Sequence, residues 1–456
     1  MNKMSKKAEF ASKIGLVAAT VGSAVGLGNV WRFPAVTQQN GGAAFLLIYI
    51  CCVFLLGVPV MIAEFSLGRA GGSDVVGSFK NLGAKRIWWS VGGLAILASY
   101  MILCFYMVVA GWTFEYLWQS ITGLLYQPVE GVTTLGGQFS ARMQQFIGGS
   151  WDPLINTYVV IILNMVVLMI GVQKGIERLS NVLMPLLFVI LIIFACVSMS
   201  LPGAAAGIEY FLKPDFSAVN SSTVLSALGQ AFFSLSLGMG ILVTYSSYFP
   251  RDTKLTRTAV TVSMLDLLVA FMMGLVIFPA VTSFGLEGDG LEGATLVFVT
   301  LPEVFANMPA TQLWSILFFL LLFVAALTST ISIAEVSVAF IVDRFGTNRI
   351  KAALIVLLPL FVFSTLCSLS QGPLSGFTLG GKTIFDLLDD VATNMLLPIV
   401  SIFVCLYVGW FGPKKLLFDE VTNHGEMRSR FHGPILLILR YVAPLLIAII
   451  LLGRFL

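Results

Sequence analysis

Charged side chains are scarce in this chain. Of its 456 residues, 11% are charged and 58% are hydrophobic, and the formal net charge is only +3 at pH 7. Soluble proteins rarely have this composition, which is typical of a polytopic membrane protein. The few basic residues are spread over separate polar segments, so the sequence predicts no nucleic-acid partner and places the chain in a lipid bilayer.

Residues that carry metal or nucleophile chemistry are also few. The two histidines, His424 and His432, lie in one polar segment near the end of the chain, so no histidine relay crosses the membrane. The six cysteines all fall in apolar segments without metal-ligand spacing, and buried small hydrophobic residues are the better interpretation. Without a nucleophile, metal or phosphate motif, we do not predict an enzyme.

Long apolar runs occupy most of the sequence. Eleven of them are long enough to cross a bilayer, and we expect an all-α membrane protein with one domain over residues 1–456. The predicted spans lie near 12–37, 42–69, 88–124, 155–171, 176–199, 223–249, 258–284, 310–342, 351–369, 386–411 and 434–453.

The distribution of Lys and Arg predicts the orientation of these spans. Most basic residues fall in the N-terminal segment and in the loops after the second, fourth, sixth, eighth and tenth spans. Under the positive-inside rule, these segments face the cytoplasm. Eleven spans then put the N-terminus inside and the C-terminus outside the cell membrane.

Two spans are weakened in their middle by small and polar residues. The first contains Gly-Ser-Ala-Val-Gly-Leu-Gly-Asn-Val-Trp-Arg-Phe-Pro over residues 22–34, and the sixth contains Ser and Gly over residues 234–240. An arginine within a membrane span is costly, about 2.5–3.5 kcal/mol. Unwound backbone that lines an internal cavity explains such segments, although close helix packing is the simpler alternative.

These residues resemble a known family. The run Gly-Leu-Gly-Asn-Val-Trp-Arg-Phe-Pro at 26–34, followed by Asn40-Gly41-Gly42 and Ala44-Phe45, is similar to the neurotransmitter:sodium symporter family. The resemblance implies the LeuT fold, with five-helix inverted repeats at 12–199 and 223–411 and an extra helix at 434–453. Many members have twelve helices, so this chain looks like an eleven-helix bacterial transporter of hydrophobic amino acids.

Oxygen-bearing residues in the eighth span match a sodium site. The carbonyl of Ala325 and the hydroxyls of Thr328 and Ser329 fall on one helix face, and sodium prefers oxygen ligands. Such hydroxyls can also bond to their own helix. The resemblance implies that these three residues, with the carbonyls of Gly22 and Val25, form the second of two sodium sites.

Asp266 is an acid within the seventh span, which makes it a functional candidate by default, with a structural hydrogen-bonded acid as the alternative. The resemblance implies a first sodium site formed by Asp266 with Ala24, Asn29 and Ser234. Chloride-dependent members bind the anion at positions matching Tyr49, Gln230, Ser234, Asp266 and Ala270. Because this chain has an acid at 266 and lacks a serine at 270, we expect sodium but no chloride as a cofactor.

The resemblance also implies a substrate pocket for an amino acid. The Tyr106 hydroxyl and the N–H groups of Leu27 and Gly28 would hold the carboxylate. Gly26 stands where monoamine carriers have an aspartate, which favours a substrate with its own carboxylate. The expected substrate-binding residues are Ser23, Ala24, Leu27, Gly28, Ile102, Tyr106, Phe233, Ser234, Ser236, Met239, Ser329 and Ile333.

Gate residues follow from the same resemblance. Arg32 and Asp389 match an outer ion pair below which Phe233 closes the pocket. Lys7, Asp343 and Tyr248 match an inner gate. Lysine lacks the bidentate geometry of the arginine that is usual at position 7, so a looser gate is expected. Unwinding between Gly175 and Pro185, or a simple kink there, is a further expectation.

The sequence therefore predicts sodium-coupled symport of neutral, apolar or aromatic L-amino acids by alternating access. Three alternatives stay open at this point: a proton-coupled transporter that uses Asp266 or Glu335, a sodium-dependent sensor without net transport, and a channel. The oligomeric state is left open as well.

Overall fold

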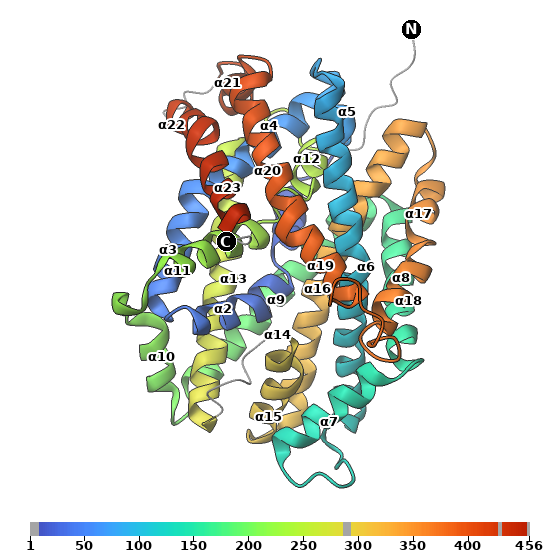
Figure 1. Cartoon of the computed structure of the whole chain (residues 1–456), viewed down its shortest axis with the longest axis vertical. Coiled ribbons are helices and arrows are strands. Elements are labelled where there is room, and N and C mark those ends of the chain that lie inside the picture. Colours follow the sequence, from blue (N-terminus) through green and yellow to red (C-terminus); the bar gives the residue numbers. More distant parts are fainter. Residues whose placement is uncertain (1–8, 286–292, 427–430, 454–456) are drawn as a thin grey trace.

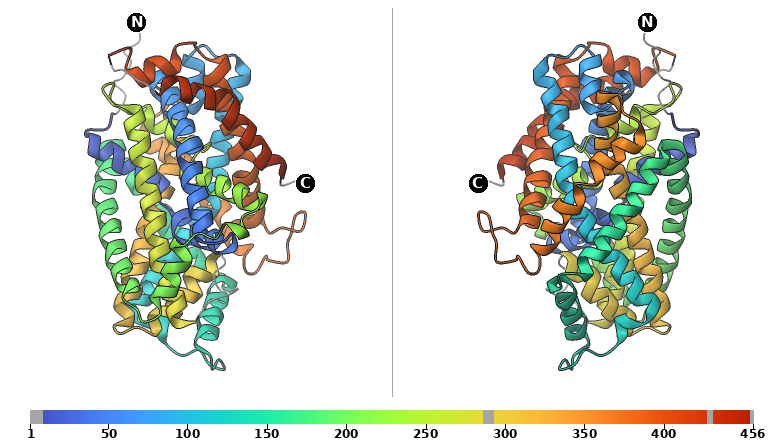
Figure 2. Two further views of the ribbon diagram at one scale, coloured as in Figure 1. Left: turned by 90° about the vertical axis from the view of Figure 1, so that its left-hand side faces the viewer. Right: turned by 90° about the vertical axis from the view of Figure 1, so that its right-hand side faces the viewer.

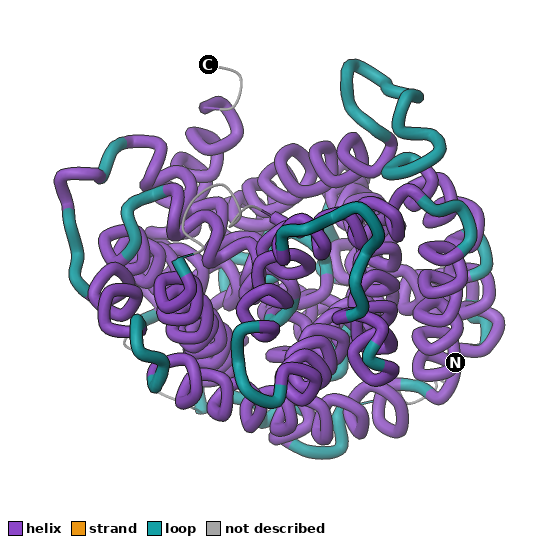
Figure 3. Tube along the Cα trace, turned by 90° about the horizontal axis from the view of Figure 1, so that it is seen from below, coloured by secondary structure: helices purple, strands orange, loops and turns teal. Residues whose placement is uncertain are grey.

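The computed structural model describes residues 9–285, 293–426 and 431–453, and these residues fold into helices joined by short connections. Seen from below, the described chain contains no β-strand (Figure 3), and its one β feature is an isolated bridge between Leu379 and Lys382. An all-helical fold is what the apolar runs predict, because helices satisfy their backbone groups internally in a bilayer.

The helices run mostly along the long axis of the molecule (Figures 1 and 2). In the first half of the chain they are α1 (Lys13–Ala24), η1 (Gly28–Arg32), α2 (Phe33–Gln39), α3 (Ala43–Cys52), η2 (Val53–Gly57), α4 (Val58–Gly71), α5 (Val75–Asn81), α6 (Arg86–Thr122), η3 (Leu124–Tyr126), α7 (Leu135–Gly148), α8 (Asp152–Ile170), η4 (Val172–Glu177), α9 (Arg178–Met199), α10 (Ala204–Leu212) and η5 (Phe216–Ala218).

The second half continues in the same way. Its helices are α11 (Ser221–Ser234), α12 (Ile241–Ser246), α13 (Leu255–Phe284), α14 (Gly293–Thr295), η7 (Leu296–Thr300), α15 (Leu301–Ala306), α16 (Thr311–Phe345), α17 (Arg349–Leu357), α18 (Leu360–Leu369), α19 (Ile384–Val391), η8 (Ala392–Leu396), α20 (Leu397–Leu406), η9 (Tyr407–Phe411), α21 (Leu416–Thr422), α22 (His432–Leu437), η10 (Ile438–Val442) and α23 (Ala443–Gly453).

Nine of the described helices are long and apolar enough to cross a membrane, and a tenth crossing results if the bent pair Lys13–Ala24 and Gly28–Gln39 is one span. Their bounds agree with ten of the predicted spans. The predicted span 223–249 falls on α11 and α12, each of which is too short to cross alone. The count of eleven spans therefore stays a prediction.

Both weakened segments interrupt their helices. α1 ends at Ala24 because Val25 has extended backbone, and the chain bends by 53° before the π-helical turn η1. α11 ends at Ser234, and the connection to α12 includes left-handed residues at Ser236, Gly238 and Gly240. By contrast, residues 175–185 are helical, so the unwinding expected there is not seen in this structure.

Each of the interrupted helices packs against several neighbouring helices. α6 and α16 pack against each other, and α1 packs against α9, α13 and α16. α5, α17 and α21 lie towards one end of the molecule, while α7, α10 and α15 lie towards the opposite end (Figure 1). This arrangement brings residues 22–29, 233–240, 266 and 325–333 together.

Candidate functional site

A small cavity of about 20 Å³ lies where the two interrupted helices meet α6 and α16. Eleven of the twelve expected substrate-binding residues line it, and Leu27 does not. Gly26 lines it in addition. The lining residues are Ser23, Ala24, Gly26, Gly28, Ile102, Tyr106, Phe233, Ser234, Ser236, Met239, Ser329 and Ile333.

Leu27 contributes through its backbone. The N–H of Leu27 donates to the Tyr106 hydroxyl oxygen at 3.0 Å, which places that hydroxyl beside the break after α1. The Ser236 hydroxyl donates to the Ser23 carbonyl at 2.8 Å and so joins the two interrupted helices. One end of the cavity is therefore polar, whereas Ile102, Met239 and Ile333 make the rest apolar.

A fully buried cluster surrounds Asp266 next to this cavity. The Asn29 side-chain amide donates to the Asp266 carboxylate at 2.8 Å, and the Ser234 hydroxyl donates to the other carboxylate oxygen at 2.7 Å. Ser234 and Ala24 also line the cavity. The carboxylate, hydroxyl and amide oxygens suit a hard cation such as sodium, so the residues present fit the ion expected here.

The positions matched to a chloride site are arranged around the same carboxylate. The Tyr49 hydroxyl and the Ser234 hydroxyl both point at Asp266, at 3.5 and 2.7 Å. Gln230 instead donates to the Gly28 carbonyl at 3.1 Å, and Ala270 is buried without a hydroxyl to offer. Of these positions, Tyr49 and Ser234 thus direct their donors at the Asp266 carboxylate.

The residues expected at the second sodium site also meet. The Ser329 hydroxyl lies 3.5 Å from the Gly22 carbonyl and 3.3 Å from the Val25 carbonyl. The Thr328 hydroxyl donates within its own helix to the carbonyls of Val324 and Ala325, both at 3.1 Å. These oxygens all come from neutral groups, which is compatible with a monovalent cation.

The outer gate residues are near one another without forming an ion pair. The Arg32 guanidinium lies over the Phe233 ring, 4.5 Å from its centroid, and the Asp389 carboxylate accepts from the Thr393 hydroxyl at 3.3 Å. Phe233 in turn lines the cavity. Within the described residues, Arg32 makes a cation–π contact with Phe233 in place of the expected ion pair with Asp389.

The inner gate has partners that the sequence interpretation did not include. Lys7 lies outside the described residues. The Asp343 carboxylate accepts from the Asp74 N–H at 2.8 Å, and the Tyr248 hydroxyl donates to Glu335 at 2.8 Å. Arg349 forms a two-pronged ion pair with the same Glu335.

Asp74 adds a third acid to this gate, outside the membrane-spanning helices. Burial raises its pKa, and the nearby Asp343 adds to that increase, while the N–H groups of Gly77 and Val76 oppose it. The carboxylate caps α5 through those two N–H groups, at 3.2 and 2.9 Å.

Comparisons with known proteins identify the class of transporter. A family model described as the sodium:neurotransmitter symporter family matches residues 7–130 and 140–455. The chain belongs to this family. It is therefore a multi-pass membrane protein of a sodium-dependent transporter family.

Individual members of this symporter family resemble the chain over nearly its whole length. The uncharacterized sodium-dependent transporter YhdH of Bacillus subtilis is 37% identical, covering 98% of both chains. The sodium-dependent serotonin transporter of Drosophila melanogaster is 31% identical over 89% of this chain and 69% of its own length. The crystal structure of MhsT in complex with L-phenylalanine is 39% identical, with a TM-score of 0.89 and coverage of 98% of this chain and 100% of that one. The symporter fold seen here is thus the LeuT fold.

Sequence reasoning used Gly26 to infer the substrate class but did not list it among the substrate-binding residues, and it missed Glu64. Gly26 lines the cavity because it sits at the break, and a Cβ there would lie 2.8 Å from the Tyr106 hydroxyl oxygen and 2.7 Å from the Ser329 hydroxyl oxygen. Glu64 of α4 is fully buried, and its carboxylate accepts from the Gly238 N–H at 2.8 Å. The sequence did contain a signal for Glu64, because an acid that stands alone in an apolar run is a functional candidate by default.

Proposed function

We propose that this protein imports neutral, apolar or aromatic L-amino acids together with sodium by alternating access and without chloride. The observation that carries the proposal is the position of Ser234. It lines the cavity and also donates to Asp266, so substrate and ion would share a wall and bind in a coupled way.

The polarity of the cavity supports the substrate class. The Tyr106 hydroxyl and the backbone at Leu27 and Gly28 offer hydrogen bonds to a carboxylate at one end. The remaining lining includes no charged side chain, and burying an unpaired charge from a substrate would be prohibitive. L-phenylalanine, which is bound to MhsT in its crystal structure, has this chemistry.

The arrangement around Asp266 supports independence from chloride. Its carboxylate supplies a fixed negative charge next to the expected first sodium, with Tyr49 and Ser234 directed at it. The carbonyls near Ser329 support a second sodium site. The predicted cytoplasmic N-terminus and extracellular C-terminus complete the proposal.

Uptake by proteoliposomes tests this function directly. Labelled phenylalanine and leucine should accumulate under an inward sodium gradient and not under potassium or a pH gradient alone. Replacing chloride by gluconate should leave the rate of uptake unchanged. Unlabelled tryptophan should compete with the labelled substrate, whereas lysine, glutamate and tryptamine should not. A requirement for chloride would contradict the role of Asp266, accumulation driven by a proton gradient alone would favour proton coupling, and sodium-dependent binding without accumulation would favour a sensor.

A further inference from the structure

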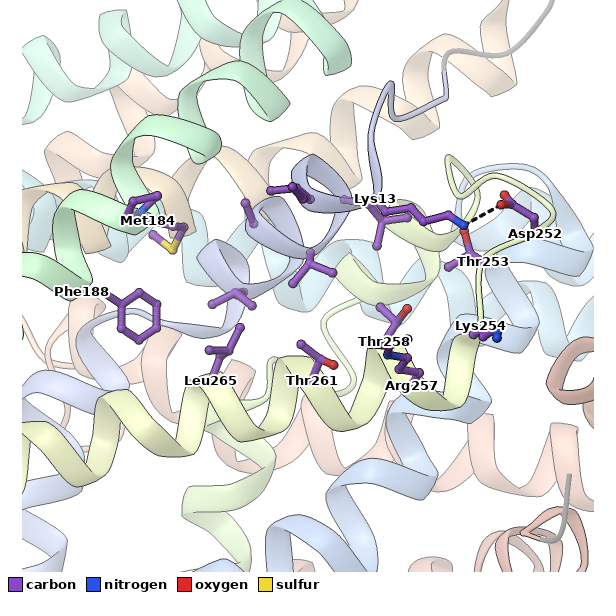
Figure 4. A pocket seen from close by; sticks show the side chains of 16 residues that line it. Lys13, Met184, Phe188, Asp252, Thr253, Lys254, Arg257, Thr258, Thr261 and Leu265 are labelled. Carbon is purple, nitrogen blue, oxygen red and sulfur yellow. Dashed lines mark ion pairs between the residues drawn. The ribbon is translucent and has the colours of Figure 1, made fainter.

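A large groove lies on the outside of the bundle, away from the substrate cavity. Its volume is about 620 Å³, and its walls are formed by α1, α9 and the N-terminal part of α13 (Figure 4). We call it the α1/α13 groove. Neither the proposed transport site nor the gates account for it.

The two ends of the α1/α13 groove differ in chemistry. Lys13, Lys254 and Arg257 gather at one end, whereas Phe188 and Leu265 line the other (Figure 4). Lys13 is paired with Asp252 at 2.7 Å. Lys254 and Arg257 are exposed and form no ion pair with any described residue. The polar end is thus positively charged and open to an anionic group.

The apolar end continues along the same helix. A second cavity of about 540 Å³ shares Thr261 and Leu265 with the groove and extends to Leu268 and Phe271, with Phe54 of η2 on its far side. Its lining is apolar apart from Thr261, and Leu268 and Phe54 are 43% and 37% exposed. The two cavities adjoin at Thr261 and Leu265 and together mark a path along α13.

The length of this path corresponds to one lipid leaflet. From Arg257 to Leu268, α13 rises about 16 Å at about 1.5 Å per residue. Half of the hydrocarbon core of a bilayer is about 15 Å thick. Lys254 and Arg257 therefore lie at the depth of the lipid headgroups when the apolar part of the path lies along the acyl chains.

We propose that the α1/α13 groove binds one anionic glycerophospholipid, with its phosphate at Lys254 and Arg257 and an acyl chain along Thr261, Leu265 and Leu268. Charge complementarity at one end and a leaflet-long apolar path at the other identify this occupant. A zwitterionic lipid fills the apolar path equally well but gains less at the cationic end, because its headgroup has no net negative charge.

The groove is separated from the proposed second sodium site by one side chain. Met184 lines the groove, and its Sδ and Cε atoms lie 3.5 Å from a Cβ placed on Gly22. The Gly22 carbonyl faces Ser329. A lipid bound in the groove would thus lie against Met184, whose side chain is next to Gly22.

Native mass spectrometry of the detergent-purified full chain tests the lipid site without any transport measurement. The protein is titrated with phosphatidylglycerol or with phosphatidylcholine of the same acyl chains. Wild type should bind phosphatidylglycerol preferentially. Lys254→Ala/Arg257→Ala should bind it about twenty-five-fold more weakly, because each basic residue near an anionic lipid contributes about fivefold.

Two further variants separate the groove from surface charge in general. Lys414→Ala/Lys415→Ala removes two exposed cations outside the groove and should change the affinity by less than about twofold. Leu265→Trp retains the cations but fills the junction of the two cavities, and it should lower phosphatidylglycerol binding. Lys254→Gln/Arg257→Gln repeats the charge test if the alanine pair is unstable. Equal binding of both lipids, equal losses in the two charge variants, or wild-type binding by folded Leu265→Trp would overturn the proposal.

Discussion

At the scale of single residues, the site depends on small side chains that leave room for polar atoms from other helices. Gly26 is the clearest case, since the Tyr106 and Ser329 hydroxyls both approach the space where a side chain would be. The sequence suggested Gly26 as a marker of substrate class. The structure adds a steric role, because any side chain at this position must displace one of the two hydroxyls.

We expect Gly26→Ala to lower the affinity for phenylalanine by at least about tenfold, since losing one hydrogen bond to a charged group costs about 1.5–3 kcal/mol. Scintillation proximity binding at saturating sodium measures this effect. Gly229→Ala is the matched control, because a Cβ there meets nothing within 4 Å. If Gly26→Ala binds like wild type, the Tyr106 hydroxyl does not hold the substrate carboxylate. Because of the same crowding, Gly26→Asp alone should not be enough to make the pocket prefer amines to amino acids.

Asp266 carries the only charge in its buried cluster. Asp266→Asn should weaken sodium binding by at least about tenfold, because a neutral amide replaces a carboxylate that accepts from Asn29 and Ser234. Adding Ala270→Ser should make uptake respond to chloride. Uptake measured in chloride and in gluconate checks both effects, with Ala270→Ser alone as the control. Unchanged sodium dependence in Asp266→Asn would remove this residue from the ion site.

The proposed second sodium site can be tested on one helix. Ser329→Ala and Thr328→Ala should each raise the sodium concentration needed for half-maximal binding. Thr330→Ala should not, although Thr330 is equally buried and its hydroxyl also donates within α16, to the Leu327 carbonyl. Sodium titrations of tryptophan fluorescence report these values. If all three variants match wild type, the hydroxyls of Ser329 and Thr328 are structural.

At the scale of elements, α1 is held at both ends by residues distant in sequence. Its C-terminal end meets α16 through Ser329, and its N-terminal end meets Glu177 of η4. The Glu177 carboxylate accepts from the Ala11 N–H at 2.8 Å and from the Ser12 N–H at 3.0 Å. A carboxylate at this position also complements the helix dipole.

Glu177→Gln should loosen the start of α1, because an amide has one acceptor oxygen and no charge. Hydrogen exchange of a peptide covering residues 9–16 should become faster by about fivefold, which corresponds to about 1 kcal/mol for a carboxylate at a helix N-terminus. Glu115→Gln, which alters a carboxylate bonded to Gln119 and Asn156, serves as the comparison. Unchanged exchange at residues 9–16 would show that packing alone holds this end.

At the scale of the whole molecule, the sequence predicted what depends on local pattern. Apolar runs predicted ten of the spans to within a few residues, and glycine and serine at 22–28 and 234–240 indicated the two interruptions. The pairing of polar groups that are distant in the sequence was harder to predict. Tyr248 reaches Glu335 and Arg349, and Arg69 pairs with Glu420, because packing selects one partner among several acids of similar depth. Periodicity carries no information about that choice.

The lipid proposal extends to the ion by thermodynamic linkage. If an anionic lipid in the α1/α13 groove favours the position of α1 that turns the Gly22 and Val25 carbonyls toward Ser329, lipid and sodium must each raise the affinity for the other. We therefore expect the sodium concentration for half-maximal phenylalanine uptake to be at least about fivefold lower in vesicles containing phosphatidylglycerol than in phosphatidylcholine alone.

Lys254→Ala/Arg257→Ala should remove this difference, whereas Lys414→Ala/Lys415→Ala should keep it. Met184→Ala should still bind the lipid but show a smaller difference, because the side chain that lies between the groove and Gly22 is shortened. Equal sodium dependence in both vesicles, with lipid binding intact, would mean that the lipid occupies the groove without acting on the ion site.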